Sequence, residues 1–145
     1  RATNMIGEAD YIYKEGVALQ KRGEGLLLIK DDNLLRSALV KYNEVIKIHP
    51  SSDKIDDAAF RAAGIYEHFK DYSIAIVYYK RAFQWDPETP YPARFKAAYI
   101  LDRLLHRRAE ALELYQEALR KDRLSDNYRE FAQMRIGEIT SENSQ

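Results

Sequence analysis

Three stretches of the chain align with one another without a gap, and this internal repeat most restricts how the chain can fold. They read ALVKYNEVIKIHP at residues 38–50, AIVYYKRAFQWDP at 75–87 and ALELYQEALRKDR at 111–123. Successive copies therefore begin 37 and 36 residues apart. A period in this range is typical of proteins that stack copies of one helical unit.

Each copy has the period of an α-helix, because its apolar residues recur every three or four positions. Alanines stand where another helix approaches closely, and a tyrosine fills the space beside them. Proline ends the first two helices, since it lacks the amide hydrogen that the helix needs; Arg123 takes that position in the third, which we expect to end less sharply. The residues expected to pack the repeats are Ala38, Tyr42, Pro50, Ala63, Tyr66, Ala75, Tyr79, Ala82, Pro87, Ala98, Ala111, Tyr115 and Ala118.

A partner helix is expected before each of these three helices. Residues 56–69 and 92–104 both place alanines on one helical face, and Asp71 is in position to cap the helix that starts at Tyr72. Residues 5–29 are also helical in pattern. Their glycines weaken a helix by up to about 1 kcal/mol each, so this region is expected as one helix or as two segments.

A last amphipathic helix follows the third repeat. Over residues 125–140 an apolar stripe recurs at helical spacing, with Ser125 or Asp126 as the cap. Such a helix would cover the apolar end of a stack of repeats. Residues 141–145 have nothing to bury, and we expect them to fray.

Residues 58–87 resemble a tetratricopeptide repeat, a two-helix unit of roughly 34 residues. The resemblance rests on a tyrosine at position 66 in the first helix and one at 72 in the turn, followed by the alanine, tyrosine, alanine and proline at 75, 79, 82 and 87. Copies one and three depart from the pattern in their first helices, and Ala59 takes the family's tryptophan position. The similarity covers about residues 22–123.

The resemblance implies an all-α protein of about seven helices that forms a right-handed superhelix. It places one domain over residues 1–145, with repeats at about 8–52, 53–89 and 90–124, a capping helix at about 125–140 and a frayed tail at 141–145. The lengthened loops between repeats are similar to those of bacterial envelope-assembly lipoproteins.

The charge balance argues against nucleic acid as a partner. The chain has 23 basic and 23 acidic side chains, so the broad attraction that draws proteins onto phosphate backbones is missing. The longest apolar run, at 26–29, is far shorter than the roughly 20 residues that cross a bilayer. There is no cysteine, which suits either the cytoplasm or a bacterial periplasm. No charged-then-apolar leader precedes the repeats, so a signal peptide is expected to be absent or removed.

No motif for catalysis or metal binding is recognisable. The three histidines lack the i, i+4 spacing of a metal pair, and His49 and His106 are expected at the surface. The acidic pairs at 31–32 and 56–57, and the acids at 122 and 126, lack the glycine and distal glutamate of a calcium loop, and are interpreted as charges at helix starts. We expect no enzyme activity, no cofactor and no metal.

In the family that this chain resembles, the first helix of each pair lines a concave surface that binds peptides or partner proteins. The positions matching that surface are Phe60, Arg61, Gly64, Glu67, His68, Phe95, Lys96, Tyr99, Asp102 and Arg103. Three aromatic residues among them, Phe60, Phe95 and Tyr99, are candidate anchors for a partner, unless they pack against a neighbouring repeat or the first helix.

Two functions follow from this fold. The first is a non-catalytic scaffold that binds an apolar or mixed segment of another protein. Some family members instead grip a terminal carboxylate with lysines, asparagines and an arginine, but here the matching residues are Phe60, Gly64, Glu67, Pro92 and Lys96, of which only the last fits. The alternative is a self-assembling structural module, for example of a bacterial envelope assembly, that associates through its terminal helices with Trp85 and Phe131 in the contact.

Overall fold

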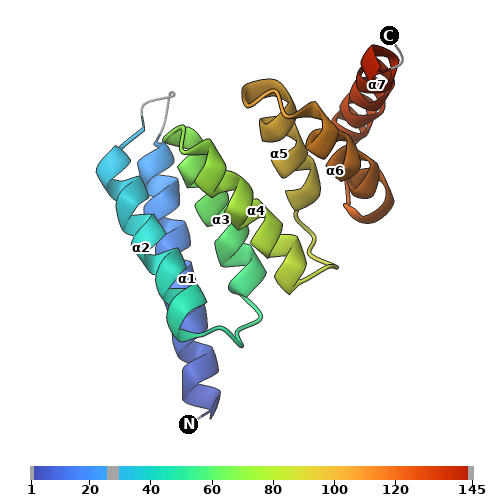
Figure 1. Cartoon of the computed structure of the whole chain (residues 1–145). Coiled ribbons are helices and arrows are strands. Elements are labelled where there is room, and N and C mark those ends of the chain that lie inside the picture. Colours follow the sequence, from blue (N-terminus) through green and yellow to red (C-terminus); the bar gives the residue numbers. More distant parts are fainter. Residues whose placement is uncertain (1, 26–29, 144–145) are drawn as a thin grey trace.

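The chain is all-α. The computed structural model describes residues 2–25 and 30–143, with side chains from residue 7 onward, and this described part holds seven α-helices and no strand (Figure 1). The prediction of an all-α chain with about seven helices is confirmed. The helices are α1 Ala2–Glu24, α2 Asp32–Ile48, α3 Ile55–His68, α4 Tyr72–Trp85, α5 Ala93–Tyr99, α6 Arg108–Lys121 and α7 Asp126–Asn143, and α5 continues into a π-helical turn, η1 Ile100–Leu104.

Each helix packs against the next one in the sequence. The most extensive contacts join α1 to α2 and α3 to α4, and smaller ones join α2 to α3, α4 to α5, α5 to α6 and α6 to α7. Figure 1 shows the resulting order, in which the helices follow one another from the amino terminus to the carboxyl terminus. This packing is compatible with a helical repeat, in which contacts are mainly between neighbours.

The repeated alanines and tyrosines make up most of the core between these helices. Tyr42, Tyr79 and Tyr115 are buried, as are all the alanines expected to pack the repeats. Tyr66 is half-buried against Tyr78, with their ring centroids 4.9 Å apart. The prolines at 50 and 87 are exposed, which fits a role in ending helices and not in filling the core.

All three repeated helices end at the same point of the alignment. The helices α2, α4 and α6 end two residues before Pro50, Pro87 and Arg123, so the third stops as sharply as the others without a proline. Asp122 explains this stop. Its backbone is extended, with φ −77° and ψ 149°, and its carboxylate accepts hydrogen bonds from Arg94 and from the amide of Phe95, both at 3.0 Å.

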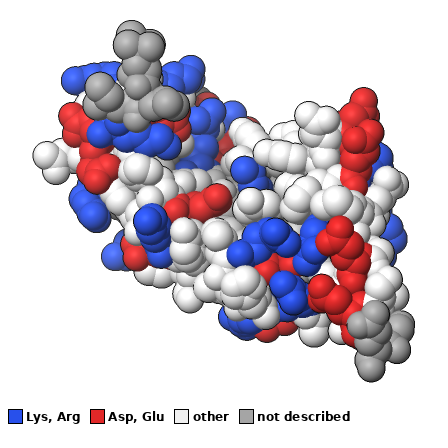
Figure 2. Space-filling view, turned by 90° about the horizontal axis from the view of Figure 1, so that it is seen from above, with Lys and Arg blue, Asp and Glu red and all other residues white. Residues whose placement is uncertain are grey.

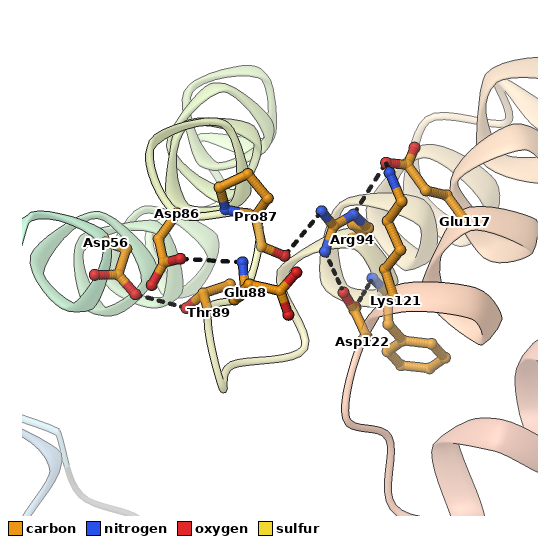
Figure 3. A network of polar contacts seen from close by, with 10 residues as sticks. Asp56, Asp86, Pro87, Glu88, Thr89, Arg94, Glu117, Lys121 and Asp122 are labelled. Carbon is orange, nitrogen blue, oxygen red and sulfur yellow. Dashed lines mark hydrogen bonds and ion pairs between the residues drawn. The ribbon is translucent and has the colours of Figure 1, made fainter.

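Figure 3 shows the network that holds this stop and the turn before α5. The Arg94 guanidinium is buried, and it also donates to Glu117 at 3.0 Å and to the carbonyl of Pro87 at 3.3 Å. Nearby, the Thr89 hydroxyl donates to Asp56 at 2.7 Å. Asp56 and Asp122 were interpreted as charges at helix starts. Asp56 does lie in the first turn of α3, where it is buried. The interpretation is wrong for Asp122, which is buried at the end of α6.

The first helix is a single one, despite its glycines. Gly16 and Gly23 face α2 so closely that a Cβ atom would lie 2.8 Å from Tyr42 Cε1 and 2.9 Å from Leu35. These glycines therefore allow α1 and α2 to approach each other. Residues 26–29, which include the longest apolar run and the end of the predicted helix, lie outside the described residues.

The last helix is longer than predicted. α7 runs to Asn143, so residues 141–143 of the expected tail are helical, and 144 and 145 lie outside the described residues. Ser125 is its cap, since its hydroxyl accepts a hydrogen bond from the amide of Tyr128 at 3.2 Å. At α4 the predicted cap residue, Asp71, occupies the capping position but its side chain makes no capping bond.

Candidate binding groove

Three alternate helices meet at one pocket. α3 contributes Glu67, α5 contributes Phe95, Lys96 and Tyr99, and α7 contributes Asn127, Tyr128 and Phe131 to a pocket of about 460 Å³. Figure 2 shows a hollow in the outline of the molecule, between the end that carries α1 and α2 and the end that carries α7. α3 and α5 are the first helices of their pairs, and α7 follows the last pair. The pocket therefore lies where the first helices of successive units come together.

Aromatic rings form the walls of the pocket. Phe95 stacks on Tyr128 with ring centroids 4.3 Å apart, and Phe131 stands edge-on to Phe95 at 6.1 Å. Phe95 is only 3% exposed, so it is held by the chain itself and is not a free anchor. Tyr99 is 37% exposed, with its ring 5.7 Å from that of Phe131. Tyr99 is therefore the predicted anchor that the fold leaves accessible.

Two charged side chains line the same pocket. Glu67 accepts a hydrogen bond from the Tyr79 hydroxyl at 2.8 Å. Burial raises the pKa of Tyr79 well above its ordinary value, and the neighbouring Glu67 carboxylate raises it further, so Tyr79 stays a neutral donor. The Lys96 ammonium lies 5.6 Å from the centre of the Tyr128 ring, within the range of a cation–π interaction.

Phe60, another predicted anchor, packs against the chain's own aromatic residues. Its ring stacks on Tyr91 at 4.7 Å and meets Tyr79 edge-on at 5.4 Å. The alternative stated for the candidate anchors, packing against a neighbouring repeat, therefore describes Phe60 and Phe95. Tyr91 is fixed in turn by a 2.6 Å hydrogen bond from its hydroxyl to Asp57.

The remaining predicted groove residues of α3 are half-buried and have different neighbours. Arg61 donates to the Tyr13 hydroxyl at 2.9 Å and to Gln20 at 3.4 Å, both on α1. His68 lies 2.9 Å from Asp32 at the start of α2. A Cβ atom at Gly64, between them, would lie in ordinary van der Waals contact with the Tyr79 hydroxyl oxygen at 3.8 Å, without a clash.

Asp102 was predicted to face the groove, and this prediction is wrong. The π-helical turn carries Asp102 into the interior, where it is fully buried and bonded to Arg135 and Tyr115. Burial alone would raise the pKa of Asp102, but the hydrogen bonds from Arg135 and Tyr115 lower it below the ordinary value. Arg103, the next residue, is exposed. On a regular helix Asp102 shares a face with Phe95, and both residues are buried because α7 packs on that face through Arg135 and Tyr128.

The contribution of α7 to the pocket was missed. The stretch DNYREF was interpreted as the start of a capping helix that faces the core, with Phe131 also assigned to the contact of the self-assembly alternative. Tyr128 and Phe131 do pack on the core, but they also form a wall of the pocket with Asn127. Aromatic residues three positions apart at a helix start were the available signal, and the position of α7 relative to α5 could not be read from it.

The positions of the histidines and acids within the described residues determine whether any group of them could bind a metal ion. No group of three or more His, Asp or Glu side chains suited to a metal ion occurs in the described residues. The surface position expected for His49 is wrong, since its ring is buried with Nε2 3.9 Å from a Glu8 carboxylate oxygen. His106 is exposed, as expected, with a positive φ of 54° in the turn before α6.

Comparisons with known proteins leave the family open. No family model matches this sequence, and no curated protein matches it. Within residues 2–25 and 30–143, no helix combines the length and the apolar character that a membrane crossing requires.

Proposed function

We propose that this protein is a non-catalytic binding scaffold of the tetratricopeptide type, in which the helix pairs form a right-handed superhelix and its concave face holds a segment of another protein. The observation that carries the proposal is the aromatic pocket between α3, α5 and α7. A family of this kind binds its partners along the first helices of successive pairs. The pocket is formed by these helices and by α7, which follows the last pair.

The exposure of Tyr99 supports this function. A large aromatic ring left in water beside a pocket is the kind of apolar surface that marks an interaction site. Burying such a side chain in a complex contributes about 1.5–3 kcal/mol. Its neighbours in the pocket are rigid, because Phe95, Tyr128 and Phe131 pack on one another, so a partner meets a preformed surface.

The test compares Tyr99→Ala with Tyr11→Ala. Tyr11 is 65% exposed on α1 and does not line the pocket, so it is a control of the same residue type. Proteins from the native cell are captured on wild type and on both variants, and circular dichroism checks the helical content. We expect Tyr99→Ala alone to lose a captured partner. A partner held equally by all three proteins would contradict binding at this pocket.

A second candidate function, self-assembly, is favoured by a different surface. Exposed apolar residues recur at matching positions of the repeats: Val40 and Val77 stand two residues after the first alanine, and Ile48 and Trp85 stand ten after it. In α6 the same two positions hold Glu113 and Lys121. An apolar surface of this kind on α2 and α4 suits contact with another copy of the chain.

Sedimentation measurements over a range of concentrations separate the two functions. If self-assembly is correct, wild type gains mass with concentration and Val40→Ser/Val77→Ser stays monomeric. The control Glu113→Ser, at the matching position of α6, leaves the association unchanged. A wild-type protein that remains monomeric at high concentration would exclude this candidate.

A further inference from the structure

The positions predicted to line the groove carry an excess of positive charge once the fold is known. They include three cationic residues, Arg61, Lys96 and Arg103, and two acidic ones, Glu67 and Asp102. The acidic charge of Asp102 is removed from that surface, because its carboxylate is buried and paired with Arg135. Glu67 remains as the acidic residue of this set, and it already accepts the Tyr79 hydroxyl.

Within the described residues, the cations of this set form no close ion pair, although the charge of Arg103 acts on the buried Asp102 carboxylate. In the part of the protein that the structure describes, no acidic side chain lies within 4.0 Å of the charged nitrogens of Arg61, Lys96 or Arg103. Arg61 and Lys96 are half-buried, and their neighbours are neutral: the Tyr13 hydroxyl and Gln20 for the first, the Tyr128 ring for the second. A carboxylate from outside the chain would complement both.

Lys96 lines the aromatic pocket in which an apolar side chain of a partner would be bound. It lines the same pocket as Tyr99, Tyr128 and Phe131, so a ligand atom in the pocket is close to its ammonium group. Gly64 precedes Glu67, another residue of the pocket, by three positions, or about 4.5 Å along the axis of α3. Because Gly64 has no side chain, a partner's backbone can approach α3 there more closely than at another residue.

We propose that the groove binds an internal segment of a partner protein in which a bulky apolar side chain enters the pocket and a neighbouring acidic side chain pairs with Lys96. This inference rests on the proposed function and specifies its ligand. A free carboxyl terminus is not required, because the carboxylate comes from a side chain.

Blocked synthetic peptides test the proposal without a known partner. Three nonapeptides of glycine and serine, acetylated and amidated, carry Glu-Phe-Glu, Lys-Phe-Lys or Glu-Ala-Glu at the centre. Backbone amide NMR signals of Lys96, Tyr99 and Tyr128 report binding at the pocket. We expect the Glu-Phe-Glu peptide to bind most tightly, by about two- to fivefold over Lys-Phe-Lys, the range for a partly exposed ion pair, and this preference should weaken in high salt.

A charge reversal gives the decisive comparison. Lys96→Glu is expected to invert the order, so that Lys-Phe-Lys binds better than Glu-Phe-Glu, and the control Lys47→Glu on the exposed side of α2 is expected to keep the wild-type order. Circular dichroism checks that both variants are folded.

The possible failures are distinguishable. Equal binding of both charged peptides at the pocket of wild type overturns the acidic preference and leaves the proposed function standing. Glu-Ala-Glu binding as tightly as Glu-Phe-Glu overturns the role of the apolar pocket. If no peptide shifts these signals, the proposed groove function itself is contradicted.

Discussion

Asp102 and Arg135 form a two-pronged ion pair in the interior, with Nε 2.7 Å from Oδ2 and Nη2 2.8 Å from Oδ1. Asp102 lies in the π-helical turn after α5, and Arg135 lies in the middle of α7. The Tyr115 hydroxyl of α6 donates to the same carboxylate at 2.9 Å. The pair therefore fixes α7 against the two helices before it, and α7 carries one wall of the candidate groove.

Replacing Arg135 by methionine is expected to lower the free energy of unfolding by about 3–5 kcal/mol, because the buried Asp102 charge loses its main partner. Urea unfolding followed by circular dichroism measures this change. Arg135 also pairs with the exposed Glu138, and Glu138→Gln is the control, with an expected effect below about 1 kcal/mol. Equal effects of the two variants would show that burial of the pair is not the cause.

The free energy of unfolding is expected to depend on pH in part through the ionisation of Asp102. Its pKa is lowered in the folded protein, so its contribution to stability is present above the unfolded value of about 3.9 and is lost as the pH falls through the lower folded value. Burial raises the pKa of Asp56 and Asp122. The effect of these two residues on stability is therefore opposite to that of Asp102, because their ionisation lowers the free energy of unfolding as the pH rises through the raised pKa values.

The measurement compares urea unfolding of wild type and Asp102→Asn from pH 3 to pH 7. The difference between the two proteins should be largest near neutral pH and should shrink as the pH falls below about 4. A difference that stays constant over this range would contradict a lowered pKa for Asp102.

Two glycine-to-alanine changes are expected to act in opposite directions. Gly16→Ala places a methyl group 2.8 Å from the buried Tyr42 ring, whose hydroxyl is held by Gln20, and overpacking of this kind costs about 1–3 kcal/mol. Gly64→Ala meets nothing closer than 3.8 Å and gains up to about 1 kcal/mol from helix propensity. Thermal unfolding of both variants tests whether their effects on stability have opposite signs. Stabilisation by Gly16→Ala would show that α1 and α2 are not held at this distance.

Arg123→Pro is expected to be tolerated and to stabilise the protein by about 0.4–1 kcal/mol. The residue before a proline must be extended, and Asp122 already is, with ψ 149°. In the described residues the Arg123 amide donates no backbone hydrogen bond that a proline would remove. Denaturant midpoints compare this variant with Arg123→Ala as the control. A loss of stability specific to proline would mean that the end of α6 depends on the amide of residue 123.

The sequence was sufficient to predict the helices and much of the core. Small residues and a tyrosine recur at helical spacing, and this local pattern predicts which face of each helix is buried, because burial of an apolar stripe requires only the helix geometry. The burial of Tyr42, Tyr79 and Tyr115 follows from this pattern. The ends of α2 and α4 could be placed from the prolines for the same local reason.

The groove was predicted less well because its residues depend on contacts between helices. Phe60 and Phe95 occupy the predicted faces, but Tyr91 and Tyr128, which stack on them, come from a loop and from α7. Asp102 was misplaced because Tyr115 and Arg135 of the following helices bury it, and no residue pattern in ILDRL indicates those contacts.

The sequence by itself determined that this chain forms paired helices with alanine and tyrosine between them, since side-chain size and spacing act within a few residues. Only the tertiary structure decided that α6 ends without a proline, that Asp102 leaves the groove and that α7 completes a pocket. Each of these depends on a buried charge or ring meeting a partner 13 or more positions away, such as Asp122 with Arg94 or Asp102 with Tyr115. Contacts over such separations are set by how the helices pack, which no local pattern specifies.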